Sequence, residues 1–364
     1  MTDLQKLECY KCKKLLAENL VLPKGLCVYC AADEADQLPQ PQKQVKVNKR
    51  EETAQLKAEK ELALRILSRK RMLPFVEKFN PDYQAGWVHK DVCRRLEKFS
   101  QDVAEKKSPR LMLFMPPRHG KSTLASIAFP AWHLGRNPDH EFISCSYSGS
   151  LAMSFSRKVR QLLREPNYKN VFENTKLDKD SQSVESWQTT ESGGYVAAGV
   201  GGGITGKGAH VLLIDDPVKN REDAESENNR EATWDWYTST AYTRLSPGGG
   251  ILVILTRWHD DDLAGRLLQH AENGADEWEV VKYPAIAEED EEFRAAGEPL
   301  HPERYNLESL EMIQRAIGPR DWTALYQQNP VSDEGDYFTR DMVRYYEPDE
   351  IDYDRLRYYC AWDL

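Results

Sequence analysis

The chain has 364 residues, of which 40% are hydrophobic and 30% are charged, and its formal net charge is −10. This length allows two or three domains with a large core, and the composition is that of a soluble globular protein. The acidic balance argues against a protein coated in nucleic acid. No apolar run approaches the ~20 residues that span a bilayer, and the N-terminus lacks a signal peptide's apolar centre, so we expect an intracellular protein that is not secreted and has no membrane partner.

Four of the seven cysteines form two C-x-x-C pairs near the N-terminus. Cys9 and Cys12 are separated from Cys27 and Cys30 by fourteen residues. Two such pairs place four thiolates tetrahedrally around one zinc ion, and a segment this short needs a metal to fold. We therefore predict a structural, zinc-ribbon-like Zn²⁺ unit over residues 1–33. The alternative is four cysteines that happen to be paired.

A polar, proline-bearing stretch follows and predicts a linker over residues 34–50. Helix-forming residues with apolar spacing then predict a helical extension that stops around Pro74. Between Lys43 and Arg71 we count ten Lys or Arg residues against four Glu. This basic stretch is either a solvated helix face or a local nucleic-acid patch, and charge alone does not separate the two.

From about residue 82 to 330, short apolar runs alternate with helical patterns. The runs are RLMLFM, EFISCSY, HVLLIDD and ILVILT. Short apolar runs bounded by turn formers are typical of buried parallel strands. The sequence therefore predicts an α/β domain with a central, mainly parallel sheet flanked by helices.

The stretch LMLFMPPRHGKST follows the pattern G-x-x-x-x-G-K-[ST] of a phosphate-binding loop except at Met115, where the first glycine is missing. A buried strand precedes it and a helical pattern follows, which is the context the motif requires. Gly120, Lys121 and Ser122, with Thr123 beside them, would supply backbone N–H groups, an ammonium for the outer phosphates of ATP and a hydroxyl for Mg²⁺. Arg118 adds a second cation that we expect to contact phosphate.

An acidic strand end accompanies this loop in HVLLIDDP. We expect Asp215 to hold Mg²⁺, directly or through water, and Asp216 to orient or deprotonate the attacking water. A strand that ends in a turn is the alternative interpretation. Together with the GKST sequence, the acidic pair favours nucleotide hydrolysis.

The glycine-rich stretch GVGGGITGKGAH matches the spacing of a dinucleotide site at Gly201, Gly203 and Gly206. It leads into a strand, however, whereas the dinucleotide pattern needs a strand before it and a helix after it. We therefore reject a dinucleotide site. Lys207 in this loop is expected to approach DNA or a neighbouring subunit.

Several stretches in order over residues 80–330 resemble the large terminase subunit of tailed bacteriophages, the ATPase that drives DNA into the capsid. They are NPDYQAGWVH, MPPRHGKST, SCSYSGSLAMSFSRKVR, GVGGGITGKGAHVLLIDDPVKN, ILTRWHDDDLAGRLL and ALYQQNP. A phosphate loop headed by Pro-Pro-Arg is itself a mark of that family. The resemblance implies a P-loop NTPase fold, with the ATPase domain over residues 51–330 and a C-terminal lid within it.

The resemblance also implies roles for further residues. Gln84 would contact adenine, with Trp87 and His89 nearby, unless the latter two belong to a buried aromatic cluster. Thr256 would couple hydrolysis to movement. An arginine from a neighbouring subunit completes the site in ring-shaped motors of this family, and the candidates are Arg157 and Arg160, for which a basic helix face is an equally good explanation.

Family members carry a second, RNase H-like nuclease domain, and RYYCAWDL resembles its first strand, with Asp363 as a metal ligand. We expect residues 331–364 to be a linker and this strand. One carboxylate cannot build a two-metal site, so nuclease activity is expected only of a longer form of the protein.

The resulting prediction is a DNA-packaging motor that couples Mg-ATP hydrolysis to translocation of double-stranded DNA. Its implied partners are the portal protein, the small terminase subunit and further copies of itself in a ring on the procapsid, with a monomer as the alternative for the isolated chain. Its implied location is the host cytoplasm and, transiently, the procapsid portal. Two alternatives stay open: a helicase-type nucleic-acid ATPase, and a zinc-dependent module that binds DNA or a partner and has a degenerate P-loop.

Overall fold

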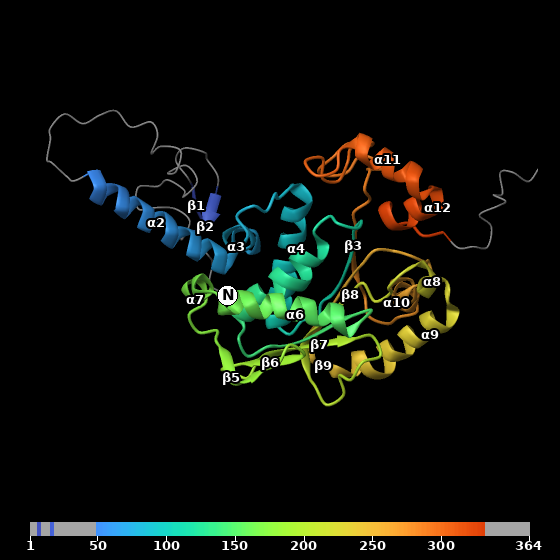
Figure 1. Ribbon diagram of the computed structural model, residues 1–364, viewed down its shortest axis with the longest axis horizontal. Helices are drawn as coiled ribbons and strands as arrows, with labels where there is room; N and C mark the ends of the chain where they lie inside the picture. Colours follow the sequence, from blue (N-terminus) through green and yellow to red (C-terminus); the bar gives the residue numbers. More distant parts are fainter. Residues whose placement is uncertain (1–5, 9–14, 18–48, 332–364) are drawn as a thin grey trace, which may run out of the picture. The chain divides into compact units, whose positions relative to one another are not determined.

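The computed structural model describes residues 6–8, 15–17 and 49–331 (Figure 1). The chain divides into two compact units, residues 1–59 and 60–364, which we describe separately. In the first unit, β1 (Lys6–Glu8) and β2 (Leu15–Ala17) form a two-stranded antiparallel sheet. The four cysteines and Asp363 lie outside the described residues, so the zinc unit and the nuclease strand remain predictions.

The second unit contains an eight-stranded sheet in the order β10-β3-β9-β8-β4-β7-β6-β5. The six strands from β10 to β7 in this order are parallel, and β6 pairs antiparallel with β7 and β5 antiparallel with β6. The strands are β3 (Arg110–Phe114), β4 (Glu141–Ser146), β5 (Leu177–Gln182), β6 (Ser186–Thr189), β7 (Gly194–Gly199), β8 (Ala209–Asp215), β9 (Leu245–Leu255) and β10 (Glu279–Lys282). The predicted mainly parallel sheet is confirmed.

Helices connect the strands of the sheet. The α-helices are α2 (Lys49–Lys70), α3 (Met72–Phe79), α4 (Trp87–Ala104), α5 (Phe129–Arg136), α6 (Gly149–Arg164), α7 (Pro166–Val171), α8 (Arg221–Glu225), α9 (Glu227–Trp236), α10 (Leu263–Glu272), α11 (Leu307–Ile317) and α12 (Pro319–Asp321). The shorter helical segments are the π-helices η2 (Thr123–Ala128), η3 (Tyr237–Ala241) and η5 (Trp322–Tyr326) and the 3₁₀ turn η4 (Tyr242–Arg244). Helices α3, α4, α5 and α6 pack on one face of the sheet and α9 and α10 on the other (Figure 1). No helix within the described ranges is long and apolar enough to cross a membrane.

Helices cover both faces of the sheet. Successive residues of a strand point to opposite faces, so each strand contributes to two apolar clusters. Leu111 and Leu113 belong to a cluster formed with α3, α4, α5 and α6. Met112 and Phe114 belong to a second cluster formed with α9, η3 and α10. The central strands are buried on both faces and therefore read as continuous apolar runs in the sequence.

The helical extension ends earlier than its sequence pattern suggests. α2 stops at Lys70, Arg71 is extended with φ −124° and ψ 137°, and α3 begins at Met72. Pro74 lies in the first turn of α3, where its missing N–H leaves no helical hydrogen bond unmade. The proline therefore marks the start of a second helix rather than the end of the first.

After β10 the chain forms a separate structure that we call the 284–329 segment. It contains α11, α12 and η5, which lie apart from the helices that cover the sheet in Figure 1. Ala285, Leu310 and Trp322 form a small core of its own. The segment is closed by a hydrogen bond of 2.7 Å from the N–H of Ala285 to the carbonyl of Tyr326.

Candidate functional site

Polar side chains gather at the carboxyl edge of the sheet, where the adjacent strands β3, β9 and β8 end. Lys121 follows β3, Thr256 follows β9, Asp215 is the last residue of β8, and Asp216 comes directly after it. The carboxyl ends of parallel strands lie at one edge of a sheet, and ligands of open α/β sheets bind outside that edge. The structure therefore brings together four residues predicted separately from the sequence.

The connection from β3 to η2 is a compact loop. Met115, at the position without glycine, still pairs with the sheet, since its N–H donates to the carbonyl of Leu255 at 3.4 Å and its side chain is buried. The turn comes later: Arg118 has φ +61° and Gly120 has φ +88°. A Cβ on Gly120 would lie 3.1 Å from the hydroxyl of Tyr83, so both backbone conformation and space favour glycine there.

Lys121 is buried, and its ammonium group lies between the residues at the ends of β8 and β9. It donates to Oγ1 of Thr256 and lies 3.3 Å from Oδ2 of Asp216. The N–H of Thr256 donates to Oδ1 of Asp216 at 3.1 Å, and its hydroxyl donates to the carbonyl of Met115 at 3.3 Å. Thr256 thus links the loop, the lysine and the acidic strand end.

Asp215 is fully buried beside the helix that follows the loop. Its Oδ2 accepts a hydrogen bond of 2.6 Å from the hydroxyl of Ser126, and the hydroxyl of Ser122 lies within hydrogen-bond reach. Its Oδ1 has no hydrogen-bond partner within the described part of the chain. Burial, and secondarily the charge of Asp216, raise the pKa of Asp215. A buried carboxylate with one unpaired oxygen favours the binding of a cation.

Asp216 has a left-handed backbone conformation, with φ +45°. Its N–H donates to the carbonyl of Ile254 at 2.9 Å, and its carbonyl accepts from the N–H of Tyr147 at 3.0 Å. These bonds hold the residue to the neighbouring strand ends on both sides. Its carboxylate, unlike that of Asp215, is partly exposed, so it is accessible to water at the site.

A polar cavity of about 260 Å³ adjoins the loop. It is lined by Gln84, Gly120 and Thr123, which were predicted, and by residues that sequence reasoning missed: Asn80, Asp82, Tyr83, His301 and Arg304. His89 also lines it, and its Nε2 donates a hydrogen bond of 3.1 Å to the carbonyl of His119. Burial lowers the pKa values of His89 and His119 to about 4, so both imidazoles are neutral at pH 7.

Trp87 does not line this cavity. Its ring stacks on Phe293 with centroids 5.2 Å apart and meets Tyr283 edge-on at 6.2 Å. The guanidinium of Arg294 lies over the ring of Trp87, 5.6 Å from the ring centroid. For Trp87 the aromatic-cluster interpretation therefore describes the contacts, whereas His89 lies at the cavity.

The 284–329 segment contributes the outer part of the cavity wall. The ring of Tyr305 stacks on His119 of the loop, with centroids 4.9 Å apart. The ring of His301 meets His89 edge-on at 4.6 Å. No motif in the sequence points to these individual residues; the resemblance implied only a C-terminal lid within the ATPase domain and included the stretch ALYQQNP at the end of the same segment.

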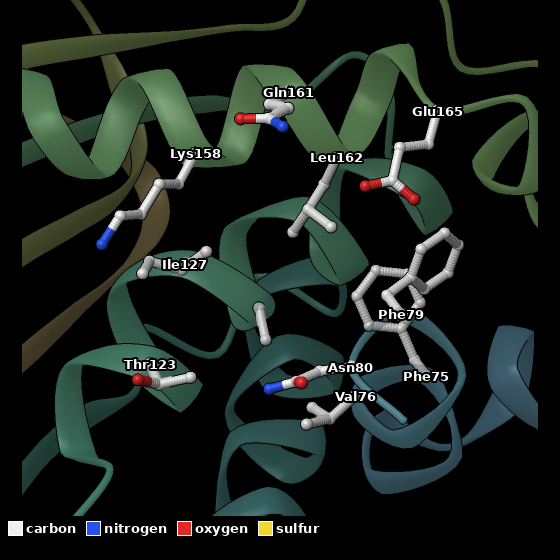
Figure 2. Close-up of a pocket in the computed structure, with 11 residues that line it drawn as sticks. Phe75, Val76, Phe79, Asn80, Thr123, Ile127, Lys158, Gln161, Leu162 and Glu165 are labelled. Atoms are coloured by element: carbon white, nitrogen blue, oxygen red, sulfur yellow. The ribbon is translucent and has the colours of Figure 1, made fainter. Parts of the chain in front are cut away.

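A second cavity of about 260 Å³ lies between α3, η2 and α6 (Figure 2). Figure 2 shows an apolar part formed by Phe75, Val76 and Leu162, with Thr123 at one side. Thr123 and Asn80 line both cavities. Since α6 packs beside η2 at this place, the helix that carries the candidate arginines contacts the helix that begins at the candidate loop.

The two candidate arginines of α6 differ in their surroundings. Arg160 donates a hydrogen bond to the carbonyl of Gln182 at the end of β5 and is partly buried. Arg157 is exposed and makes no hydrogen bond or ion pair with any residue that the structure describes. Only Arg157 is therefore available to a second molecule without first breaking a bond.

The glycine-rich loop connects β7 to β8 and is flanked by strands on both sides. Gly201 and Gly206 have φ of +76° and +78°, and no atom lies within 4 Å of a Cβ added at Gly201, Gly203 or Gly206. The absence of a helix after the loop supports the rejection of a dinucleotide site. The loop lies at the carboxyl edge beside Tyr147, and both line a further cavity near Asp216.

The fold and the site define a mixed α/β protein with a lysine-bearing loop and an acidic strand end at the carboxyl edge of its sheet. The sequence profile of the family described as "Terminase large subunit, T4likevirus-type, N-terminal" matches residues 112–344. This match covers more than half of the 364 residues. The chain belongs to this family of large terminase subunits, as the sequence resemblance indicated.

Solved structures of large terminases show some likeness to the chain. The large terminase of bacteriophage HK97 is 15% identical with a TM-score of 0.46, and the match covers 72% of this chain and 55% of that one. The large terminase of a thermophilic bacteriophage is 12% identical with a TM-score of 0.36, covering 61% and 47%, and its complex with ADP is 11% identical with 0.35, covering 62% and 51%. The chain thus spans about half the length of these proteins. No curated protein sequence matches it.

Proposed function

We propose that the chain hydrolyses Mg-ATP and that hydrolysis drives double-stranded viral DNA into a procapsid. The observation that carries the hydrolytic part is the position of Lys121, whose ammonium lies between Thr256 and Asp216 on a loop that opens a helix. Membership of the large terminase family supports the packaging part over a helicase.

The loop between β3 and η2 suits a polyphosphate because it presents hydrogen-bond donors, both backbone N–H groups and cationic side chains. A helix starts at Lys121, directly after the turn at Arg118 and Gly120, so its first N–H groups and the positive end of its dipole face the loop. Arg118 is exposed and free to reach an outer phosphate. Phosphate oxygens would compete with Asp216 and Thr256 for the ammonium of Lys121, so nucleotide binding would release these two residues.

The site also suits Mg²⁺, which is bound in such sites by one or two protein oxygens together with phosphates and water. Oδ1 of Asp215 is buried and unpaired within the described residues, and Ser122 adjoins the same carboxylate. We assign the ion to Ser122 and Asp215. Bound there, Mg²⁺ would neutralise charge on the phosphates. No group of three or more His, Cys, Asp or Glu side chains in residues 49–331 suggests another kind of metal site.

The remaining chemistry is the activation of water. We assign this to Asp216, because its carboxylate is accessible and is fixed by the N–H of Thr256. The carboxylate would accept the proton of a water that attacks the terminal phosphate, or orient that water. Thr256 bonds to both Lys121 and Asp216, so its hydrogen bonds would change when a phosphate binds Lys121 or when Asp216 binds water.

The cavity beside the loop would hold the adenosine part of ATP. Gln84 offers an amide that can donate to and accept from a base edge, as the family resemblance implies, and Thr123, which lines the same cavity, would lie between the base and the phosphates. His301 and Arg304 close it from the 284–329 segment, which would act as the predicted lid.

An arginine from a neighbouring copy would complete the site in an assembled ring, and the accessible residue is Arg157 rather than Arg160. The portal protein and the small terminase subunit are further proposed partners. Zn²⁺ at the four N-terminal cysteines is proposed from their spacing alone, as is the nuclease metal at Asp363 in a longer form.

The experiment that tests the proposal is ATP turnover by the full chain and by Lys121→Ala, with and without DNA and empty procapsids. We expect Lys121→Ala to abolish turnover and to leave the zinc content and the folding of the chain intact. Hydrolysis by the variant at the wild-type rate would refute the proposed site. If the wild-type chain hydrolysed no ATP under any of these conditions, a binding module would be the better account.

A further inference from the structure

The last turn of the 284–329 segment is bonded to the strand end that carries Thr256. Gln327 and Gln328 are adjacent and both buried, yet their amides face different partners. Gln327 accepts from the N–H of Ile286 at 3.1 Å and donates to the carbonyl of Ile286 at 2.9 Å, so it ties the segment to itself. The side chain of Gln328, in contrast, also bonds to a residue outside the segment.

The amide of Gln328 reaches the residue that follows Thr256. Its Oε1 accepts a hydrogen bond of 3.2 Å from the N–H of Arg257, and its Nε2 donates to the carbonyl of Leu325. The backbone of Gln328 has φ +57°, a conformation that residues other than glycine adopt only at a cost in conformational free energy. The hydrogen bonds of its side chain therefore help to hold Gln328 in a backbone conformation that the residue would rarely adopt by itself.

The peptide between Thr256 and Arg257 is thereby fixed on two sides. On one side, Thr256 bonds to Asp216, Lys121 and the carbonyl of Met115. On the other side, the N–H of Arg257 bonds to Gln328. The guanidinium of Arg257 adds two restraints, an ion pair of 2.7 Å with Asp262 and a position 5.1 Å over the ring of Phe114, the last residue of β3.

We propose that Gln328 is a positioning residue for ATP hydrolysis, which acts through the Thr256–Arg257 peptide and makes the orientation of Thr256 depend on the 284–329 segment. The inference rests on the proposed ATPase function. A segment that closes the nucleotide cavity with His301 and Arg304 also holds the threonine that contacts Lys121 and Asp216, so the hydrogen bond from Arg257 to Gln328 links nucleotide contacts to catalytic geometry.

The neighbouring glutamine provides a matched control. Gln327→Leu and Gln328→Leu remove the same buried amide from adjacent positions, and each loses side-chain hydrogen bonds to backbone groups. Only Gln328→Leu unpairs the N–H of Arg257. A general loosening of the segment would therefore affect both variants alike, whereas positioning of Thr256 would affect only one.

The experiment combines steady-state ATP turnover with amide hydrogen exchange on the full chain. For Gln328→Leu we expect kcat to fall about tenfold, the loss expected when one oriented hydrogen bond near the reacting groups is removed, with KM for ATP within about twofold. We expect faster exchange over residues 254–258. Gln328→Glu keeps an acceptor for the N–H of Arg257 and should restore slow exchange there, and Gln327→Leu should leave both kcat and exchange over 254–258 unchanged.

Equal losses of kcat in Gln327→Leu and Gln328→Leu, or unchanged exchange over residues 254–258 in Gln328→Leu, would overturn the proposal. Should Gln328→Leu fail to fold, Gln328→Met replaces it, because it also removes the acceptor for the N–H of Arg257, and unchanged exchange over 254–258 in that folded variant contradicts the assignment. An absence of turnover in the wild-type chain would count against the proposed function instead, and the exchange comparison between the two glutamine variants would still test Gln328.

Discussion

The carboxyl edge of the sheet and the 284–329 segment contribute to the same candidate site in different ways. At the edge, Lys121, Asp215 and Thr256 each stand within a few residues of the strand that places them. In the segment, Arg304 and Gln328 reach the site only through the path of the chain after β10. The comparison teaches that groups suited to chemistry are placed by short local motifs, whereas groups suited to enclosing a ligand are placed by tertiary packing.

The largest effect should come from the edge. Asp215→Asn removes the carboxylate that we assign to Mg²⁺, and we expect kcat for ATP to fall about a hundredfold or more, the scale of losing one electrostatic contact to a phosphoryl-transfer transition state. The same change should raise the melting temperature of the ligand-free protein, because burial disfavours this charge and raises its pKa.

Turnover assays over a range of Mg²⁺ concentrations and thermal melts without Mg²⁺ check both parts. Ser126→Ala is the control, since it removes the hydroxyl that bonds Asp215 and leaves the carboxylate in place. A variant Asp215→Asn with unchanged activity would show that Asp215 has no catalytic part.

A smaller effect is expected from the segment. Arg304→Ala should raise KM for ATP about tenfold and change kcat little, because an exposed cation that lines the cavity contributes to binding the nucleotide equally in the ground and transition states. Arg315→Ala, on the exposed part of α11, is the matched change within the same segment.

Michaelis–Menten kinetics of the two arginine variants distinguish the regions. A loss of kcat without a change of KM in Arg304→Ala would place this residue with the catalytic groups and remove the contrast between edge and segment.

The pair on α6 gives a further contrast between an accessible and an engaged side chain. We expect Arg157→Ala to lower turnover only in the assembled motor and Arg160→Ala to lower the melting temperature by a few degrees, about 1 kcal/mol, because it loses its bond to the carbonyl of Gln182. Turnover with and without procapsids, with melts of both variants, checks this. The reverse pattern would reassign the arginine.

The smallest expected effect is the dependence of the free energy of unfolding on pH below neutrality. The pKa values of His89 and His119 are lowered from 6.5 to about 4 by burial, so between these values the unfolded chain binds protons that the folded chain does not. The free energy of unfolding should therefore fall as the pH is lowered from 6.5 to 4. Urea titrations of the wild type and His89→Gln measure the slope, which should be shallower in the variant.

The sequence predicted the four strands that form the centre of the sheet, because each is buried on both faces and reads as an apolar run. It did not reveal β5, a polar edge strand with the sequence LDKDSQ, because edge strands carry no such run. It placed Lys121 and Asp215 through motif spacing. It could not place Arg304 or Tyr305, because their approach to the loop depends on long-range packing that no local pattern records.

The structure also gives a physical reason for the missing glycine. Met115 still pairs with β9, and the backbone conformations with positive φ occur at Arg118 and Gly120 instead. The backbone at position 115 therefore needs no glycine, and the apolar side chain of Met115 adds to the core under the site.

The most direct test of the central claim is a crystal structure of the chain with Mg²⁺ and a non-hydrolysable ATP analogue. We predict phosphate oxygens within hydrogen-bond distance of Nζ of Lys121 and the N–H of Gly120, Mg²⁺ beside Ser122 and Asp215, and the base against Gln84. An analogue bound elsewhere, or bound here while Lys121 still holds Asp216 and Thr256, would contradict the account.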